Sequence, residues 1–242
     1  MITRCVGANA NVEPDLFSGD VRPGDVFLLA SDGLTGMVDD KRLKQLLASK
    51  ANPARVVDAL IAEANGRGGL DNITAVLVLA DDAYLIGQVG DSRVYRLRDG
   101  ALEQLTRDHS YVQEQVDAGL LTAEQAKYHP YSNVITRCVG ANAAVEPDVF
   151  AGEVRPGDVF LLASDGLTGM VDDRRLQQLL GSRAAPARVV DALIAEANGR
   201  GGLDNITAVL VHVGGDPSGP AAPQNGTHPE GGGAGGREGA GG

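Results

Sequence analysis

A long internal repeat is the feature that most restricts how this chain folds. Residues 1–80 align without a gap on residues 134–213 at a constant offset of 133, and twelve of the 80 aligned positions differ. A period of this length corresponds to a domain-sized unit and is too long for a solenoid. The sequence therefore predicts a unit at 1–80, a connecting unit at 81–133 and a second copy of the first unit at 134–213.

Both ends of the chain carry further information. Residues 214–242 contain 12 Gly and 4 Pro in 29 positions, so they cannot bury enough apolar surface to order themselves, and we expect a disordered tail. Met1 stands where the second copy has Val134. This substitution suggests the hypothesis that a valine codon within a longer reading frame serves as the start.

The composition excludes several classes of function. The net charge is -11, Trp is absent and aromatic residues make up 4% of the chain, so neither a basic surface nor a stacking platform for nucleic acid is expected. No apolar run approaches the ~18 residues that cross a bilayer, and we expect a cytoplasmic protein without membrane contact. The only two cysteines, Cys5 and Cys138, exclude a disulfide scaffold and are expected to be reduced and buried.

The repeated unit is predicted to contain a strand, two helices and a strand. The apolar run Asp158–Ser164 and its twin Asp25–Ser31 are typical of strands that are covered on both faces. Helices are expected at Asp172–Leu180 and at Pro186–Gly199, because proline suits a first helical turn and glycine a C-terminal stop. The closing strand is expected at Ile206–Val211.

Two aspartates flank the strands of this unit. Asp165 follows the first strand and Asp204 precedes the last, so antiparallel pairing would bring both carboxylates to one edge of the sheet. Two ionised acids at one edge repel each other unless a cation lies between them, and a hard divalent ion suits their oxygen ligands. The alternative at this point is structural, with Asp165-Gly166 as a turn and Asp204 as an N-terminal turn acid.

The connecting unit is predicted to begin with a small set of strands and to end with helices. Strands are expected at Ala83–Val89, Arg93–Leu97 and Leu102–Leu105, with Asp99-Gly100 as a tight hairpin turn. One helix should carry Val112 and Val116 on one side, and Thr122 with Gln125 forms a capping-box pattern before another. We interpret His109 and His129 as helix-entry or packing residues, because neither is placed beside a nucleophile.

Four ordered motifs resemble the type 2C metal-dependent Ser/Thr protein phosphatases, specifically the small bacterial kind. They are Val89-Gly90-Asp91-Ser92-Arg93-Val94-Tyr95, Leu105-Thr106-Arg107-Asp108-His109-Ser110, Leu162-Ala163-Ser164-Asp165-Gly166-Leu167 and Gly202-Leu203-Asp204-Asn205-Ile206-Thr207. The resemblance covers 81–213 directly and 1–80 as a second copy of the family's C-terminal half. It implies an α+β fold, a two-sheet antiparallel β-sandwich flanked by helix pairs, with a site for two Mn²⁺ or Mg²⁺ ions at one edge.

The resemblance also implies roles for individual residues. Asp165 and Asp204 match the two C-terminal metal ligands of the family, and Asp91 matches the aspartate associated with a third, weaker metal. Gly169 stands where the family often carries another acid. The implied substrates are phosphorylated proteins of bacteria, with a Ser/Thr kinase as the opposing enzyme.

The chain departs from the family in its N-terminal half. The Asn-Glu-Asp segment, the Asp-Gly-Met-Gly-Gly-His segment and the phosphate-binding Arg of the family are absent, and the first repeat copy stands in their place. The resemblance then assigns Asp32-Gly33 to the slot of the metal-bridging Asp-Gly, with the Gly33 carbonyl as a further ligand. Asp71 is expected to lie elsewhere as a relic, and Glu13–Phe17 is not expected to bind metal.

The sequence therefore leads to two hypotheses on function. In the first, the chain is a protein serine/threonine phosphatase that uses metal-activated water, with activity reduced by the missing acidic motifs. In the second, it is an inactive pseudophosphatase or rearranged fragment that binds at most a metal ion or a phosphoprotein.

Overall fold

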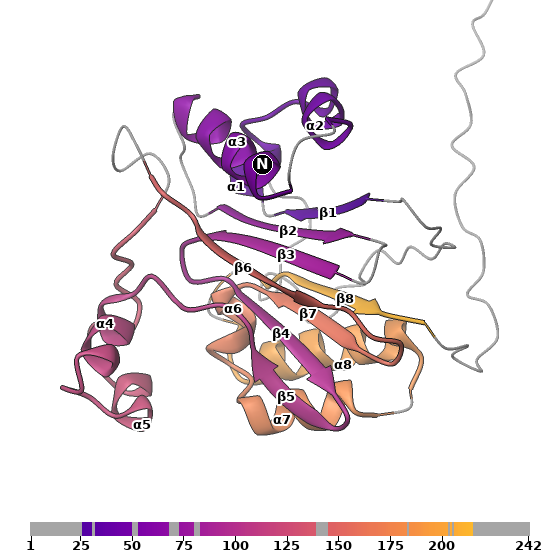
Figure 1. The fold of residues 1–242 in the computed structure, drawn as a ribbon. Coiled ribbons are helices and arrows are strands. Elements are labelled where there is room, and N and C mark those ends of the chain that lie inside the picture. The colour runs from indigo at the N-terminus through magenta and orange to yellow at the C-terminus, as the bar shows by residue number, and fades with distance from the viewer. Residues whose placement is uncertain are drawn as a thin grey trace, which may run out of the picture.

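The computed structural model describes residues 26–30, 32–49, 53–67, 73–79, 83–138, 145–182, 184–202, 204 and 206–214. Their strands form two four-stranded antiparallel sheets that lie one above the other in Figure 1. The first sheet has the order β1 (Val26–Ala30), β2 (Ile73–Leu79), β3 (Ala83–Val89), β6 (Asp148–Glu153). The second has the order β5 (Ala101–Gln104), β4 (Arg93–Arg98), β7 (Val159–Ala163), β8 (Ala208–His212).

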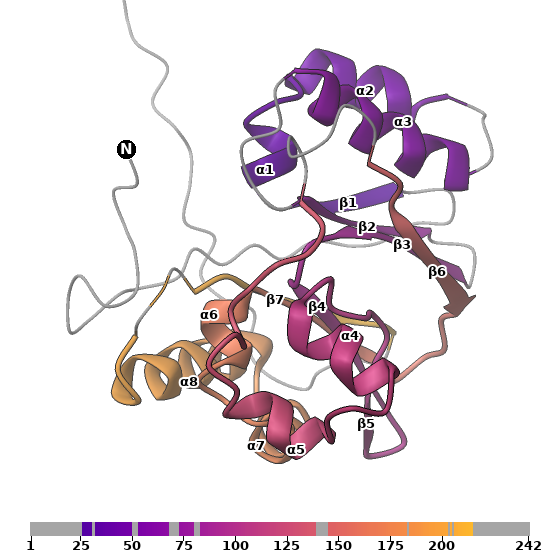
Figure 2. The same ribbon diagram turned by 90° about the vertical axis from the view of Figure 1, so that its left-hand side faces the viewer.

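A group of three helices covers the outer face of each sheet (Figure 1). The first sheet is covered by α1 (Asp32–Thr35), α2 (Asp40–Leu47) and α3 (Pro53–Gly66). The second is covered by α6 (Asp165–Thr168), α7 (Asp173–Leu180) and α8 (Pro186–Gly199). Two further helices, α4 (Tyr111–Asp117) and α5 (Ala123–Lys127), lie to the left of the sandwich in Figure 1 and in front of it in Figure 2. The predicted α+β sandwich with flanking helices is confirmed.

Alternating side chains along the strands build three apolar cores. Along β7, Leu161 packs toward α6–α8, whereas Phe160 and Leu162 pack between the sheets. Along β3, Leu85 faces α1–α3 and Ile86 faces the other sheet. Because both faces of these strands are covered, they are apolar at nearly every position, as the sequence predicted for β7.

Segments 26–79 and 159–212 fold into the same elements, and the residue numbers of most of these elements are offset by 133. The bounds of β1, α1, α2 and α3 map onto those of β7, α6, α7 and α8 at that offset. The predicted helices at 172–180 and 186–199 are confirmed, with Asp172 as the N-cap of α7. Three expectations need correction: β8 begins at Ala208, a one-turn helix follows β7, and β6 is an additional strand.

The connecting unit folds as the sequence predicted. The turn between β4 and β5 has Asp99 at φ 51° and Gly100 at φ 79°, and two left-handed residues match the twist of a tight hairpin. Both hydrogen bonds of the capping box between Thr122 and Gln125 are present at the start of α5. Cys138 is a free cysteine but only half-buried, which corrects the expectation of burial; Cys5 lies outside the described residues.

None of the helices in the described part of the chain is both long and apolar enough to pass through a bilayer.

A close approach between β3 and α3 generates the first prediction. A Cβ atom added to Gly87 would lie 2.0 Å from Cγ1 of Val57, so Gly87→Ala should lower the free energy of unfolding by about 2 kcal/mol. A Cβ atom added to Gly66, at the end of α3, would meet nothing within 4 Å. Gly66→Ala is therefore the matched control. Urea denaturation measures both, and equal stabilities would contradict the packing of β3 on α3.

A buried ion pair generates a prediction on pH dependence. Asp158 is 1% exposed and accepts hydrogen bonds from Arg98 Nε (2.7 Å), Arg98 Nη2 (2.6 Å) and the Arg155 amide (2.8 Å). Burial raises the pKa of Asp158, but these hydrogen bonds outweigh it and hold the pKa below its ordinary value. A lowered folded-state pKa means that the stabilisation is present above the unfolded-state pKa of about 3.9 and is lost as the pH falls below it.

We therefore expect Asp158→Ala to lower the free energy of unfolding by about 3 kcal/mol at pH 7, since it leaves the Arg98 guanidinium without its carboxylate partner. The cost should shrink as the pH falls below about 4, because the unfolded chain takes up a proton at this carboxyl before the folded protein does. Urea denaturation of both proteins between pH 3 and pH 7 checks this, and a cost that does not vary with pH would refute it.

Candidate metal centre

Strand pairing brings several loop ends to one end of the sandwich. In the second sheet, Ala163 pairs with both Arg93 and Ala208, so the C-terminal end of β7 lies between the beginnings of β4 and β8. In the first sheet, the end of β3 pairs with the start of β2, and the start of β2 pairs with the end of β1. Because only 90–92 separate β3 from β4, these strand ends meet at a single end of the sandwich.

This register fixes the positions of three of the predicted site residues. Asp91 lies two residues before Arg93, and Asp165 lies two residues after its partner Ala163, so both lie just beyond the same end of the β4–β7 pair. Asp204 precedes β8, the other neighbour of β7. Ser164 extends the β7–β8 pairing toward the site, because its amide donates to the Thr207 carbonyl (3.1 Å) and its Oγ accepts from the Thr207 amide (3.0 Å).

The carboxylates repel one another. Burial, followed by the negative charges of Asp165 and Asp108, raises the pKa of Asp91 to about 6. Burial and the charge of Asp204 raise the pKa of Asp165, although this residue is accessible to solvent at the surface. A raised pKa in two neighbouring acids indicates that negative charge is concentrated here beyond what the local hydrogen bonds neutralise.

This donor set fits a hard divalent cation in type and in charge, because carboxylate oxygens are the preferred ligands of such ions. Among the residues that the structure describes, however, no group of three His, Cys, Asp or Glu side chains is arranged to hold a metal ion. The negative charges act in pairs, Asp165 on Asp91 and Asp204 on Asp165.

The remaining predicted residues are placed in part. Asp32 is the first residue of α1, directly beyond the end of β1, and Gly33 is buried. In both views α1 lies above α6, the helix that begins with Asp165 (Figures 1 and 2). The side chain of Asp32 lies outside the described part of the chain, as do Asp71 and Glu13–Phe17.

The sequence reasoning gave no role to an ion pair beside these acids. Arg93 donates from Nε to both oxygens of Asp108 (3.0 Å each) and from Nη2 to Oδ2 (2.7 Å). Arg93 also contacts the hydroxyl of Tyr95 (3.1 Å). Both residues stand in motifs that the sequence analysis singled out, Arg93 in the first and Asp108 in the second. Only the fold shows that these two motifs meet.

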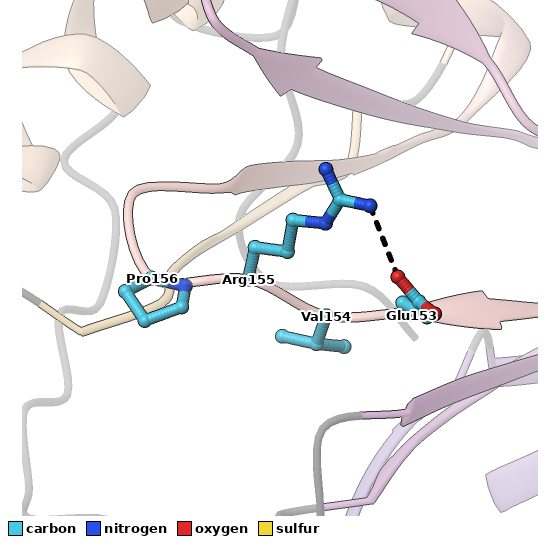
Figure 3. A pocket seen from close by; sticks show the side chains of 4 residues that line it. All are labelled: Glu153, Val154, Arg155 and Pro156. Atoms are coloured by element: carbon cyan, nitrogen blue, oxygen red, sulfur yellow. Dashed lines mark hydrogen bonds and ion pairs between the residues drawn. The ribbon is translucent and has the colours of Figure 1, made fainter.

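A surface pocket lies elsewhere. It has a volume of about 550 Å³ and is lined by Glu153, Val154, Arg155 and Pro156, with Arg155 bridged to Glu153 (Figure 3). These residues form the β6–β7 connection, at the opposite end of β7 from Asp165. The pocket is therefore not part of the candidate metal centre.

Comparison with known families identifies the fold. The sequence pattern of Protein phosphatase 2C matches residues 72–198, more than half of the chain. The chain belongs to this family. Its members are protein serine/threonine phosphatases, which are hydrolases.

Relatives and solved structures agree with this assignment. The chain is 33% identical over 198 residues to the serine/threonine phosphatase Stp of Listeria monocytogenes, a match that covers 80% of this chain and 79% of that one. A type 2C phosphatase of Streptococcus pyogenes is 40% identical over 144 residues, which span 60% of this chain and 58% of that protein's length.

The structure of the serine/threonine phosphatase PstP/Ppp of Mycobacterium tuberculosis superposes with a TM-score of 0.70 at 28% identity, covering 88% of this chain and 96% of that one. A catalytic domain of PstP in complex with two manganese ions superposes with a TM-score of 0.63 at 29% identity, covering 79% and 93%. Family neighbours of this phosphatase 2C protein thus bind manganese.

Charge crowding at this end of the sandwich generates a prediction on stability. Without metal at pH 7, Asp165→Asn should raise the free energy of unfolding by about 1 kcal/mol, because it removes repulsion from Asp91 and Asp204. Urea denaturation in the presence of a chelator measures it. Asp172→Asn, at the exposed N-cap of α7, is the control, and a loss of stability in Asp165→Asn would contradict the repulsion.

Proposed function

We propose that this chain hydrolyses phosphoserine and phosphothreonine in proteins with the help of Mn²⁺ or Mg²⁺. The observation that carries the proposal is that Asp91, Asp165 and Asp204 adjoin neighbouring strand ends at one end of a phosphatase 2C sandwich. Carboxylates crowded in this way are stabilised by a cation, and a structural neighbour was solved with two manganese ions.

In this proposal Asp165 and Asp204 hold the metal ion together with Asp32 and the carbonyl oxygen of Gly33. Asp91 lies beside Asp165 and would serve a further, weaker metal position. The support for Asp32 is its place directly after β1, at the end of the sandwich where β7 also ends. Four oxygen donors from distant stretches of the chain would then face one point.

We also propose that the first repeat copy substitutes for the N-terminal half of the family. Three domain-level segments follow: 1–80 in the N-terminal slot, 81–213 as the phosphatase core ending in the second copy at 134–213, and 214–242 as a tail. The support is that 26–79 builds a strand, three helices and a strand, in the order found in 159–212. The short helix that begins with Asp32 matches the one that begins with Asp165.

A divalent ion at this position supplies positive charge against the phosphate oxygens and an activated water as the attacking group. The residues of the chain supply the geometry. Asp165 and Asp204 orient their carboxylates from two adjacent strand ends, and the Arg93–Asp108 pair fixes the start of β4 beside them. Because positioning and charge neutralisation dominate phosphoryl transfer, losing one central carboxylate should be severe.

The proposed partners follow from the substrate class. They are phosphorylated proteins and a Ser/Thr kinase that opposes this phosphatase, and the proposed location is the cytoplasm. The support is that curated relatives from Listeria and Streptococcus are named serine/threonine or protein phosphatases.

A phosphatase assay tests the metal ligands. With Mn²⁺ and p-nitrophenyl phosphate or a phosphothreonine peptide, Asp165→Asn and Asp32→Asn should each lower turnover about 100-fold or more. Asp172→Asn is the matched control, because asparagine also caps a helix and Asp172 is exposed and pairs with Arg200. Turnover that survives Asp165→Asn would refute the site, and turnover that survives Asp32→Asn alone would refute the role of the first copy.

Calorimetric titration with Mn²⁺ separates the phosphatase from the alternative hypothesis of an inactive pseudophosphatase. The absence of the family's N-terminal acidic motifs from the sequence favours the alternative. Metal binding that Asp165→Asn abolishes, together with Mn²⁺-dependent turnover, supports the phosphatase. No binding by the wild-type protein, together with no Mn²⁺-dependent turnover, supports the inactive form.

A further inference from the structure

The connection between β3 and β4 contains Asp91 and is hydrogen-bonded to a buried histidine, His109. We propose that His109 is a positioning residue, which fixes the backbone at Gly90 and thereby places Asp91 beside Asp165. His109 touches neither proposed metal ligand nor substrate in this arrangement. Its effect on the reaction rests on the proposed function, whereas its effect on the Gly90–Ser92 connection does not.

His109 and Gly90 form a reciprocal pair of hydrogen bonds. The Gly90 amide donates to Nδ1 of the imidazole (3.0 Å), and the His109 amide donates to the Gly90 carbonyl (3.0 Å). Gly90 has a φ of 119°, a conformation that side chains rarely adopt, and it is buried. Because glycine is also free to adopt other conformations, contacts from outside the turn are needed to hold Asp91 in one place.

The other side of the imidazole is anchored to a carboxylate. Because Nδ1 accepts the Gly90 hydrogen, the neutral ring carries its proton on Nε2, which lies 3.1 Å from Oδ2 of Asp148. Arg137 Nη1 lies 3.0 Å from Nε2 and donates to Oδ1 of the same carboxylate (2.5 Å), so the ring and the guanidinium share Asp148 as their acceptor. The anchor fixes both the tautomer and the orientation of a ring that is 6% exposed.

A second residue holds the same connection at different atoms. Gln88, which is fully buried, donates to the carbonyls of Gly90 (3.2 Å) and Ser92 (2.9 Å). The side chain of His109 thus provides the hydrogen bond to the Gly90 amide, while Gln88 holds the two carbonyls. Removing the imidazole should loosen the amide and shift the turn without unfolding β3 or β4.

Two isosteric substitutions separate the two nitrogen atoms of the ring. In His109→Asn, the side-chain oxygen takes the place of Nδ1 and can still accept from Gly90. In His109→Gln, the amide group takes the place of Nε2 and leaves the Gly90 amide without its acceptor. His109→Asn removes more volume than His109→Gln, so a purely structural role in packing would make His109→Asn the more damaging of the two.

Hydrogen exchange of the Gly90 amide, measured by NMR on the metal-free full chain, tests the fastening itself. We expect exchange about tenfold faster in His109→Gln and close to wild type in His109→Asn. Equal exchange in the two variants would overturn the proposal. If His109→Gln does not fold, Asp148→Ala provides the second test, because Asp148 is 39% exposed and its loss frees the ring; unchanged Gly90 exchange there would also overturn it.

Calorimetric Mn²⁺ titration of the same variants tests the link to the metal centre. We expect His109→Gln to bind about tenfold more weakly and His109→Asn to restore affinity, as found for residues that orient ligands. Equal weakening in both would overturn the link. If the wild-type chain binds no Mn²⁺, the proposed function fails, and the Gly90 exchange alone decides whether His109 fixes the connection.

Discussion

The pairing of β7 with both β4 and β8 is the constraint on which the candidate metal centre depends. Ala163 has a partner on each side, so the residues beyond three strand ends are held at one end of the sandwich. An isolated turn at Asp165 would place one carboxylate in water. The same turn, held between two neighbours, brings it within the electrostatic reach of Asp91 and Asp204 and generates the crowded charge that suits a cation.

The polar side chains that hold these strand ends in place are buried or half-buried, and each has defined partners. Gln88 and His109 hold the connection before Asp91, and Arg93 with Asp108 fixes the start of β4. Buried polar groups are costly unless they are hydrogen-bonded, so such a network tolerates few alternative arrangements. A site built in this way is oriented before any ligand arrives, which suits phosphoryl transfer, where positioning dominates.

Two nearly identical stretches of sequence form the same elements at two different places in the sandwich. The strand Val-Phe-Leu-Leu-Ala occurs as β1 and as β7. In the second copy β4 pairs with β7 and leaves Val159 7% exposed, whereas β1 pairs with β2 and its Val26 is 40% exposed. The first copy joins the connecting unit through β2, whereas the second joins it through both β6 and β7. The unit is thus the same, and its attachment differs.

Periodicity and capping residues in the sequence determined most elements, including the bounds of α8, the Asp99-Gly100 turn and the capping box at Thr122, because these depend on neighbours within a few residues. Motif order likewise predicted the fold and the grouping of Asp165 with Asp204. The strand β6, the Arg93–Asp108 pair and the contact of His109 with Gly90 were decided only by tertiary structure. Their partners lie 15 or more residues away, and no local pattern encodes which surfaces meet.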